Sequence, residues 1–90
     1  MAKNTSRPVR NVLGSQIREK REAKGWSQAD LVRKLQLRGW DIERTVLTKI
    51  ENRRRCITDY ELIAIAQTLG VTINELLPPE NPDVRSFFAS

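Results

Sequence analysis

Apolar residues recur at helical spacing through most of this chain, and very little of it alternates in the way that a half-buried strand does. In the first such segment, Val12, Leu13 and Ile17 are separated by polar residues, and Gly25 stands where a helix can end in the left-handed conformation. This pattern predicts a first helix over residues 11–24.

A second helical segment follows directly. Ser27 offers a side-chain oxygen to cap a helix, and Asp30 places a negative charge near its positive end. The apolar stripe of this segment consists of Leu31, Val32 and Leu35. We therefore expect a helix from Gln28 to residue 37 or 38, ended by Gly39.

The stretch "RTVLTKIEN" has one apolar and one polar face. The apolar face is formed by Val46, Leu47 and Ile50, and the polar face by Arg44, Thr45, Thr48 and Lys49. Asp41 and Glu43 are both candidates for the N-cap, and either choice places Arg44 in the first turn. The sequence predicts a third helix over about residues 43–52.

Two capping boxes mark the starts of further helices. Thr58 with Glu61 opens a fourth helix that Gly70 ends, and Thr72 with Glu75 opens a fifth that ends at Pro78. The expected buried stripe of the fourth helix is Leu62, Ile63, Ala66 and Leu69. The predicted fold class is all-α, a compact bundle of five short helices.

The ends of the chain differ from its middle. Residues 1–10 include Lys3, Arg7 and Arg10 but few apolar side chains, which predicts a flexible basic arm. Residues 78–90 form a proline-rich tail that becomes apolar at Phe87 and Phe88, a candidate contact for a second copy or a partner. Residues 11–77 remain as the folded domain.

Composition restricts the function. The 90 residues are enough for one domain, and 16 Lys and Arg against 11 Asp and Glu give a formal charge of +5. This excess favours a polyanionic partner, either nucleic acid or an anionic membrane surface. No segment has the length and apolarity of a signal peptide or membrane span, so we expect a cytoplasmic protein that does not enter the membrane.

The scarcity of certain residues excludes several kinds of chemistry. The chain has no histidine and a single cysteine, Cys56, which rules out the common zinc-site spacings and any internal disulfide. We expect Cys56 to be partly buried and inert. No carboxylate pair, nucleophile–base pair or phosphate loop stands out, so the sequence predicts no enzyme, no cofactor and no metal site.

Three stretches together carry a family resemblance: "IREKREAKGWSQADLVRKL", "TVLTKIENRRR" and "ITDYELIAIAQTLGVTINELL". In this order they resemble the phage repressor/Cro-like helix-turn-helix family, also called Xre-type, over about residues 12–77. The resemblance implies a lambda-repressor-like DNA-binding domain. Two features depart from the family: the connection between Leu35 and Glu51 is longer than in its short members, and Arg53 stands where a glycine commonly follows Glu-Asn.

The polar face of the third helix also suits DNA by its chemistry. An α-helix fits the major groove, where base edges present distinguishable donors and acceptors. Arg44 has the donors for guanine, Thr45 can contact a thymine methyl, and Thr48 and Lys49 lie one turn further along. We therefore interpret this face, on a recognition helix over about residues 43–52, as one that reads bases.

The resemblance implies further roles for residues around this helix. It places Gln28 against a phosphate or an end base pair, and Asn52 and Arg54 beside the DNA backbone. Arg53 and Arg55 have the charge for phosphate contacts, although the family pattern does not specify them.

The resemblance also pairs Arg21 with Glu51. We expect a partly buried ion pair between the first and third helices, because this carboxylate has no other evident reason to stand beside Ile50.

The leading functional hypothesis is a sequence-specific transcriptional regulator that binds double-stranded DNA, as a two-fold homodimer on a palindromic operator. A second hypothesis is the antitoxin of a toxin–antitoxin pair, which binds DNA and neutralises a toxin protein. A third is a protein-interaction module that does not bind DNA.

Overall fold

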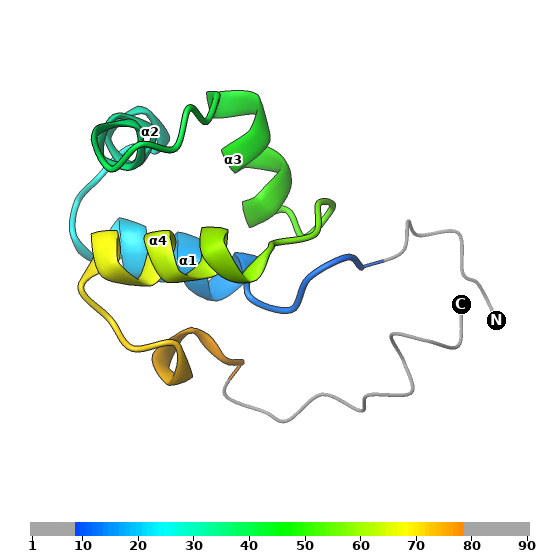
Figure 1. Ribbon diagram of the computed structural model, residues 1–90. Coiled ribbons are helices and arrows are strands. Elements are labelled where there is room, and N and C mark those ends of the chain that lie inside the picture. The colour runs from blue at the N-terminus through cyan, green and yellow to red at the C-terminus, as the bar shows by residue number, and fades with distance from the viewer. Residues whose placement is uncertain (1–8, 79–90) are drawn as a thin grey trace, which may run out of the picture.

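The computed structural model describes residues 9–78, in which all regular elements are helical (Figure 1). Within these residues, four α-helices follow one another, and a single 3-10 turn follows the last. They are α1 (Gly14–Ala23), α2 (Gln28–Leu37), α3 (Arg44–Glu51), α4 (Asp59–Leu69) and the turn η1 (Asn74–Leu76). The predicted basic arm lies largely outside the described residues, and so does the tail with Phe87 and Phe88.

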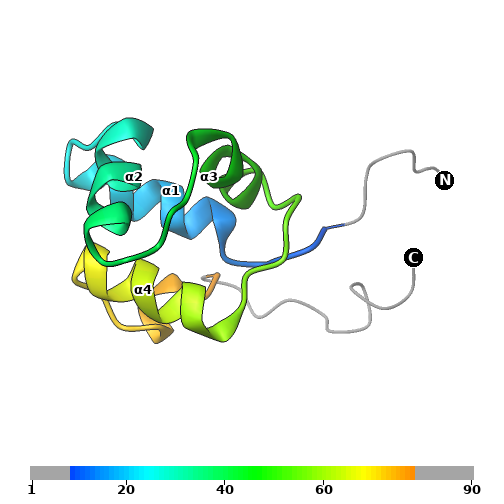
Figure 2. The same ribbon diagram turned by 45° about the horizontal axis from the view of Figure 1, so that its top comes forward.

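The helices pack around one core. α3 packs against α1 and α2, and α4 packs against the same two helices. In Figure 1, α2 and α3 lie above α1 and α4, and the turned view of Figure 2 shows α1 running behind α3. The largest fully buried side chains come from every helix, from η1 and from the loop before α3: Ile17, Leu31, Leu35, Ile42, Leu47, Ile50, Ile65, Leu69 and Leu76.

Local capping fixes the starts of α2 and α4. Ser27 accepts a hydrogen bond from the backbone of Asp30, whose carboxylate accepts one from the backbone of Ser27 in return. Thr58 and Glu61 make the same reciprocal pair at α4. Both helices begin where their capping residues predict.

The prediction of a fifth α-helix is wrong. The Thr72–Glu75 capping bonds form, but only the 3-10 turn Asn74–Leu76 follows them. Leu77 is extended, with ψ 147°, and Pro78 follows it. A proline disfavours the helical conformation in the residue before it and donates no backbone hydrogen bond, so the helix cannot continue.

Two smaller predictions also need correction. α1 begins at Gly14 rather than at residue 11, because the side-chain oxygen of Asn11 accepts bonds from the backbone of Leu13 and Gly14 and closes a turn that precedes the helix. In α4, Ile63 is 45% exposed, and Ile65 is the fully buried residue in its place. The side chains of α4 that are buried in the core are therefore those of Ile65, Ala66 and Leu69.

Gly14 allows α1 and α3 to approach each other closely. A Cβ atom at this position would clash with the backbone oxygen of Ile50 and lie 2.9 Å from that of Glu51. Only a residue without a side chain fits between the start of α1 and the end of α3. This contact fixes the position of α3 relative to the core.

Candidate nucleic-acid interface

α3 has an exposed polar face and, on its opposite side, a buried apolar face. Leu47 and Ile50 are fully buried beneath the helix, while Arg44, Thr45 and Lys49 are exposed. Glu43 occupies the N-cap position, but its side chain makes no hydrogen bond to the helix. The first turn of α3 therefore points an arginine and a threonine into solvent.

Thr48 is half-buried, and its hydroxyl faces Gln28 on α2. The hydroxyl oxygen lies 3.1 Å from Oε1 of Gln28 and 3.0 Å from the backbone oxygen of Arg44. A threonine hydroxyl has one proton, so these two acceptors compete for it. The structure thus ties Thr48 to α2 as well as to its own helix.

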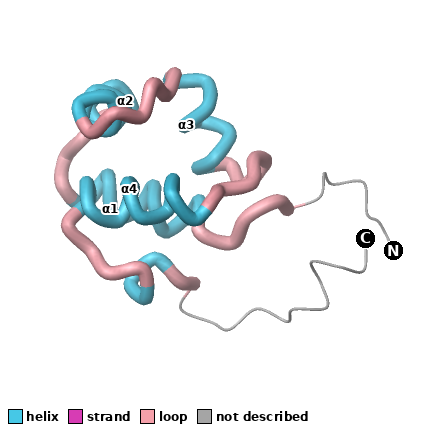
Figure 3. The backbone as a smooth tube through the Cα atoms, in the orientation of Figure 1, coloured by secondary structure: helices cyan, strands magenta, loops and turns pink. Residues whose placement is uncertain are grey.

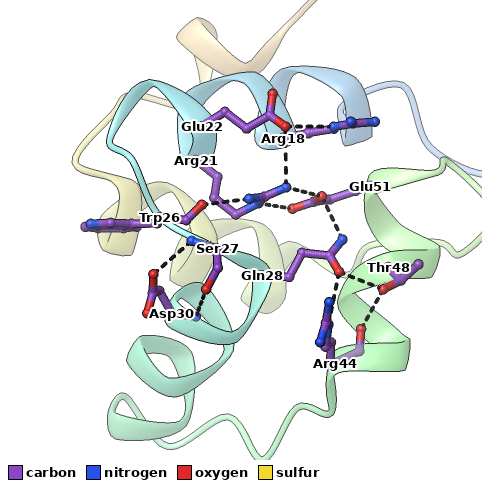
Figure 4. Close-up of polar contacts among 10 residues, drawn as sticks. All are labelled: Arg18, Arg21, Glu22, Trp26, Ser27, Gln28, Asp30, Arg44, Thr48 and Glu51. Atoms are coloured by element: carbon purple, nitrogen blue, oxygen red, sulfur yellow. Dashed lines mark hydrogen bonds and ion pairs between the residues drawn. The ribbon is translucent and has the colours of Figure 1, made fainter.

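Beneath the polar face, Arg21 of α1 forms an ion pair with Glu51 at the end of α3 (Figure 4). Arg21 Nε donates to Glu51 Oε2 at 2.8 Å and Nη2 donates to Oε1 at 3.0 Å. Nη1 of Arg21 also donates to the backbone oxygen of Trp26 at 2.7 Å. Both side chains are almost fully buried, and the hydrogen bonds to Glu51 raise the pKa of Arg21 above its ordinary value.

Gln28, the first residue of α2, connects this ion pair to the polar face of α3 (Figure 4). Its Nε2 donates to Glu51 Oε1 at 3.1 Å. Its Oε1 accepts from the Thr48 hydroxyl and, at 3.4 Å, from Arg44 Nε. One amide therefore joins a buried carboxylate to two residues of the exposed helix.

The loop after α3 carries three arginines in different settings. Arg54 is exposed, as is Asn52 at the C-cap of α3. Arg53 has a φ of 64°, the left-handed conformation that glycine adopts most easily, and its Nε donates to the backbone oxygen of Asn11 at 3.3 Å. Of the three arginines, Arg54 is the most exposed to solvent.

Arg55 is held by α4. Its two terminal nitrogens donate to the carboxylate oxygens of Glu61 at 2.8 and 3.0 Å. The bonds from Arg55 lower the pKa of Glu61 and raise that of Arg55. A phosphate would have to compete with this carboxylate for the guanidinium.

Asn11 is a structural residue that the sequence analysis did not single out. Its Nδ2 donates to the backbone oxygens of Ile50 at 3.1 Å and Arg55 at 2.8 Å. The chain before α1 and the loop after α3 therefore lie side by side, to the right of the helices in Figure 3. An asparagine before an apolar run signals a helix cap, but no local pattern reveals acceptors so distant in sequence.

Within residues 9–78, no three His, Cys, Asp or Glu side chains are grouped to hold a metal ion. In the same range, no helix combines the length and apolarity needed to cross a membrane. Cys56 is exposed, contrary to the expectation that it would be partly buried.

Comparison with known proteins matches this geometry to a family. Residues 17–76, more than half of the chain, match the helix-turn-helix family. No curated protein matches the chain.

Several solved structures share the fold. A hypothetical transcription factor, NHTF from Neisseria, is 31% identical, with a TM-score of 0.66 over 88% of this chain and 86% of its own. The DNA-binding domain of BldD is 31% identical, with a TM-score of 0.65 over 82% of this chain and 100% of its own. The restriction-modification controller protein C.AhdI from Aeromonas hydrophila is 26% identical, with a TM-score of 0.63 over 72% of this chain and 91% of its own.

The chain therefore belongs to the Xre/Cro-like helix-turn-helix family of DNA-binding regulators.

Proposed function

We propose that this helix-turn-helix protein regulates transcription by binding a specific double-stranded DNA sequence, with α3 in the major groove. The observation that carries the proposal is the outer face of α3. Arg44, Thr45 and Lys49 are exposed there on a helix whose inner face is fixed by the core and by the Arg21–Glu51 pair.

The dimensions of α3 suit this role. An α-helix with its side chains is about 10–12 Å in diameter, which fits a major groove about 12 Å wide. Arg44 in the first turn would donate to O6 and N7 of guanine, and Thr45 would contact a neighbouring base. Thr48 and Lys49 would meet bases one turn further along.

Phosphate contacts would come from residues beside the helix. Asn52 and Arg54 are exposed at the end of α3, and Arg53 is next to them. In the proposed complex they bind the backbone on one side of the groove and supply affinity that does not depend on sequence. Arg55 contributes only after leaving Glu61, so we assign it the weakest contact of the four.

The proposal includes a two-fold dimer on a palindromic operator. One domain presents few base-contacting side chains, and specific sites usually require more contacts than these supply. In such a dimer the two α3 helices, which would read the bases, would lie about one turn of the DNA apart, roughly 34 Å.

The names of the similar proteins support regulation of transcription. One is described as a hypothetical transcription factor, one as a DNA-binding domain and one as a restriction-modification controller.

Selection of bound sequences from a random double-stranded library tests the proposal. The expected result is an enriched palindrome whose affinity falls steeply as salt increases. Weak, salt-insensitive binding without enrichment would overturn the proposed function and favour a protein-interaction module. Copurification of a second small protein with a sequence-specific binder would instead identify an antitoxin.

A further inference from the structure

We infer that Gln28 is a positioning residue for the reading helix, with its amide held in one orientation by Glu51. In this orientation its carbonyl oxygen sets the conformations of Arg44 and Thr48. The inference rests on the proposed function of α3, and it gives Gln28 a different role from the phosphate contact that the family resemblance implies.

The orientation of the amide follows from the groups around it. The ionised carboxylate of Glu51 accepts hydrogen bonds and donates none, and Arg21 holds it in place through two bonds. Its Oε1 lies 3.1 Å from the Gln28 amide. If the amide were turned over, two oxygens would face each other at this distance, so the NH2 group must face Glu51.

The opposite end of the amide then presents an acceptor to α3. Arg44 Nε can only donate, the Thr48 hydroxyl can donate, and both lie within hydrogen-bonding distance of Gln28 Oε1. A turned amide would place its NH2 group against the guanidinium of Arg44, and neither group could accept. The contacts on the two sides of Gln28 therefore require the same orientation.

This arrangement prepares Arg44 for DNA. Gln28 binds Arg44 through Nε, so this bond does not use the two terminal nitrogens of the guanidinium. These are the donors that a bidentate contact with guanine would use. Without Gln28 the exposed side chain of Arg44 would sample more rotamers, and the contact with guanine would become less selective.

The main test is the base preference of Gln28→Met, which keeps the length of the side chain but removes both amide groups. Gln67→Met is the matched control, since Gln67 is exposed on α4. Affinities are measured for the selected site and for its single-base-pair variants. The base pair that Arg44 reads is the one whose preference Arg44→Ala relaxes.

We expect Gln28→Met to reduce the preference at that base pair about fivefold, the equivalent of one hydrogen bond. Gln67→Met should leave the preference unchanged. If Gln28→Met weakens all sites equally, Gln28 is a phosphate contact and the inference is wrong. If the unmodified protein selects no sequence at all, the proposed function fails instead.

A double-mutant cycle tests the amide orientation without DNA. Gln28→Glu alone brings two carboxylates together and should lower the Tm. Adding Glu51→Gln restores one donor between the two side chains. The double variant should therefore lose less stability than the sum of the losses in the two single variants. Strict additivity would show that the Gln28–Glu51 bond does not fix the amide.

Discussion

Replacing Gly14 with alanine should destabilise the protein, although alanine is the better helix former. The substitution gains up to about 1 kcal/mol of helix propensity. The new methyl group, however, would clash with the backbone oxygen of Ile50 and crowd that of Glu51 at 2.9 Å. These are main-chain atoms at the end of α3, so no side-chain rotation relieves the clash.

The magnitude follows from what must move. Overpacking a close-packed site costs about 1–3 kcal/mol. Separating α1 from α3 would also strain the bond from Asn11 Nδ2 to the backbone oxygen of Ile50, which is worth about 1 kcal/mol. After the gain in propensity is subtracted, we expect a net loss of about 1–3 kcal/mol, or about 5–20 °C in Tm for a domain of this size.

Thermal and urea denaturation, followed by circular dichroism, measure this loss. Ser15→Ala is the control, because Ser15 is exposed in the same helical turn. It should change the Tm little. A Gly14→Ala protein as stable as the unmodified one would show that the close approach of α1 and α3 does not constrain the fold.

The other predictions concern the ion pair, the loop after α3 and the reading helix. Glu51→Ala should cost about 3–5 kcal/mol in urea denaturation, because it leaves Arg21 buried without its partner; an unchanged midpoint would contradict this. Arg53→Gly should raise the Tm, since an L-residue in the left-handed conformation costs about 1–2 kcal/mol; a lower Tm would mean that the contacts of the arginine side chain outweigh this strain. Arg44→Ala should reduce the free energy of binding to the selected site by about 1–3 kcal/mol and change binding to scrambled DNA little. Arg54→Ala should weaken binding to both DNAs and reduce the slope of log affinity against log salt concentration by about one. Titrations across a salt series separate the last two, and equal losses for Arg44→Ala on both DNAs would remove it from base reading.

Local sequence determined most of the secondary structure. The capping pairs Ser27–Asp30 and Thr58–Glu61 each lie within a few residues, so their bonds could be predicted without knowing the fold. The two faces of α3 could also be predicted, because apolar residues at helical spacing lie on one side of a helix and leave the polar residues on the side that faces solvent. The family match added the pairing of Arg21 with Glu51, and the structure places these two side chains in contact.

Some local signals were incomplete or competed with one another. Thr72 and Glu75 form their capping bonds, but Pro78, which is also a local signal, stops the helix. Ile63 and Ile65 are equally apolar, and only packing against the other helices determined that Ile65 is buried.

Several contacts that fix the candidate interface join residues distant in the sequence. Gln28 meets Glu51, Arg21 meets Glu51, and Gly14 meets the end of α3. Helical periodicity specifies which way a side chain points from its own helix, but not which group on another helix it will meet. That depends on how the helices pack, and so only the folded chain shows that Gln28 faces inward to a carboxylate and outward to Arg44.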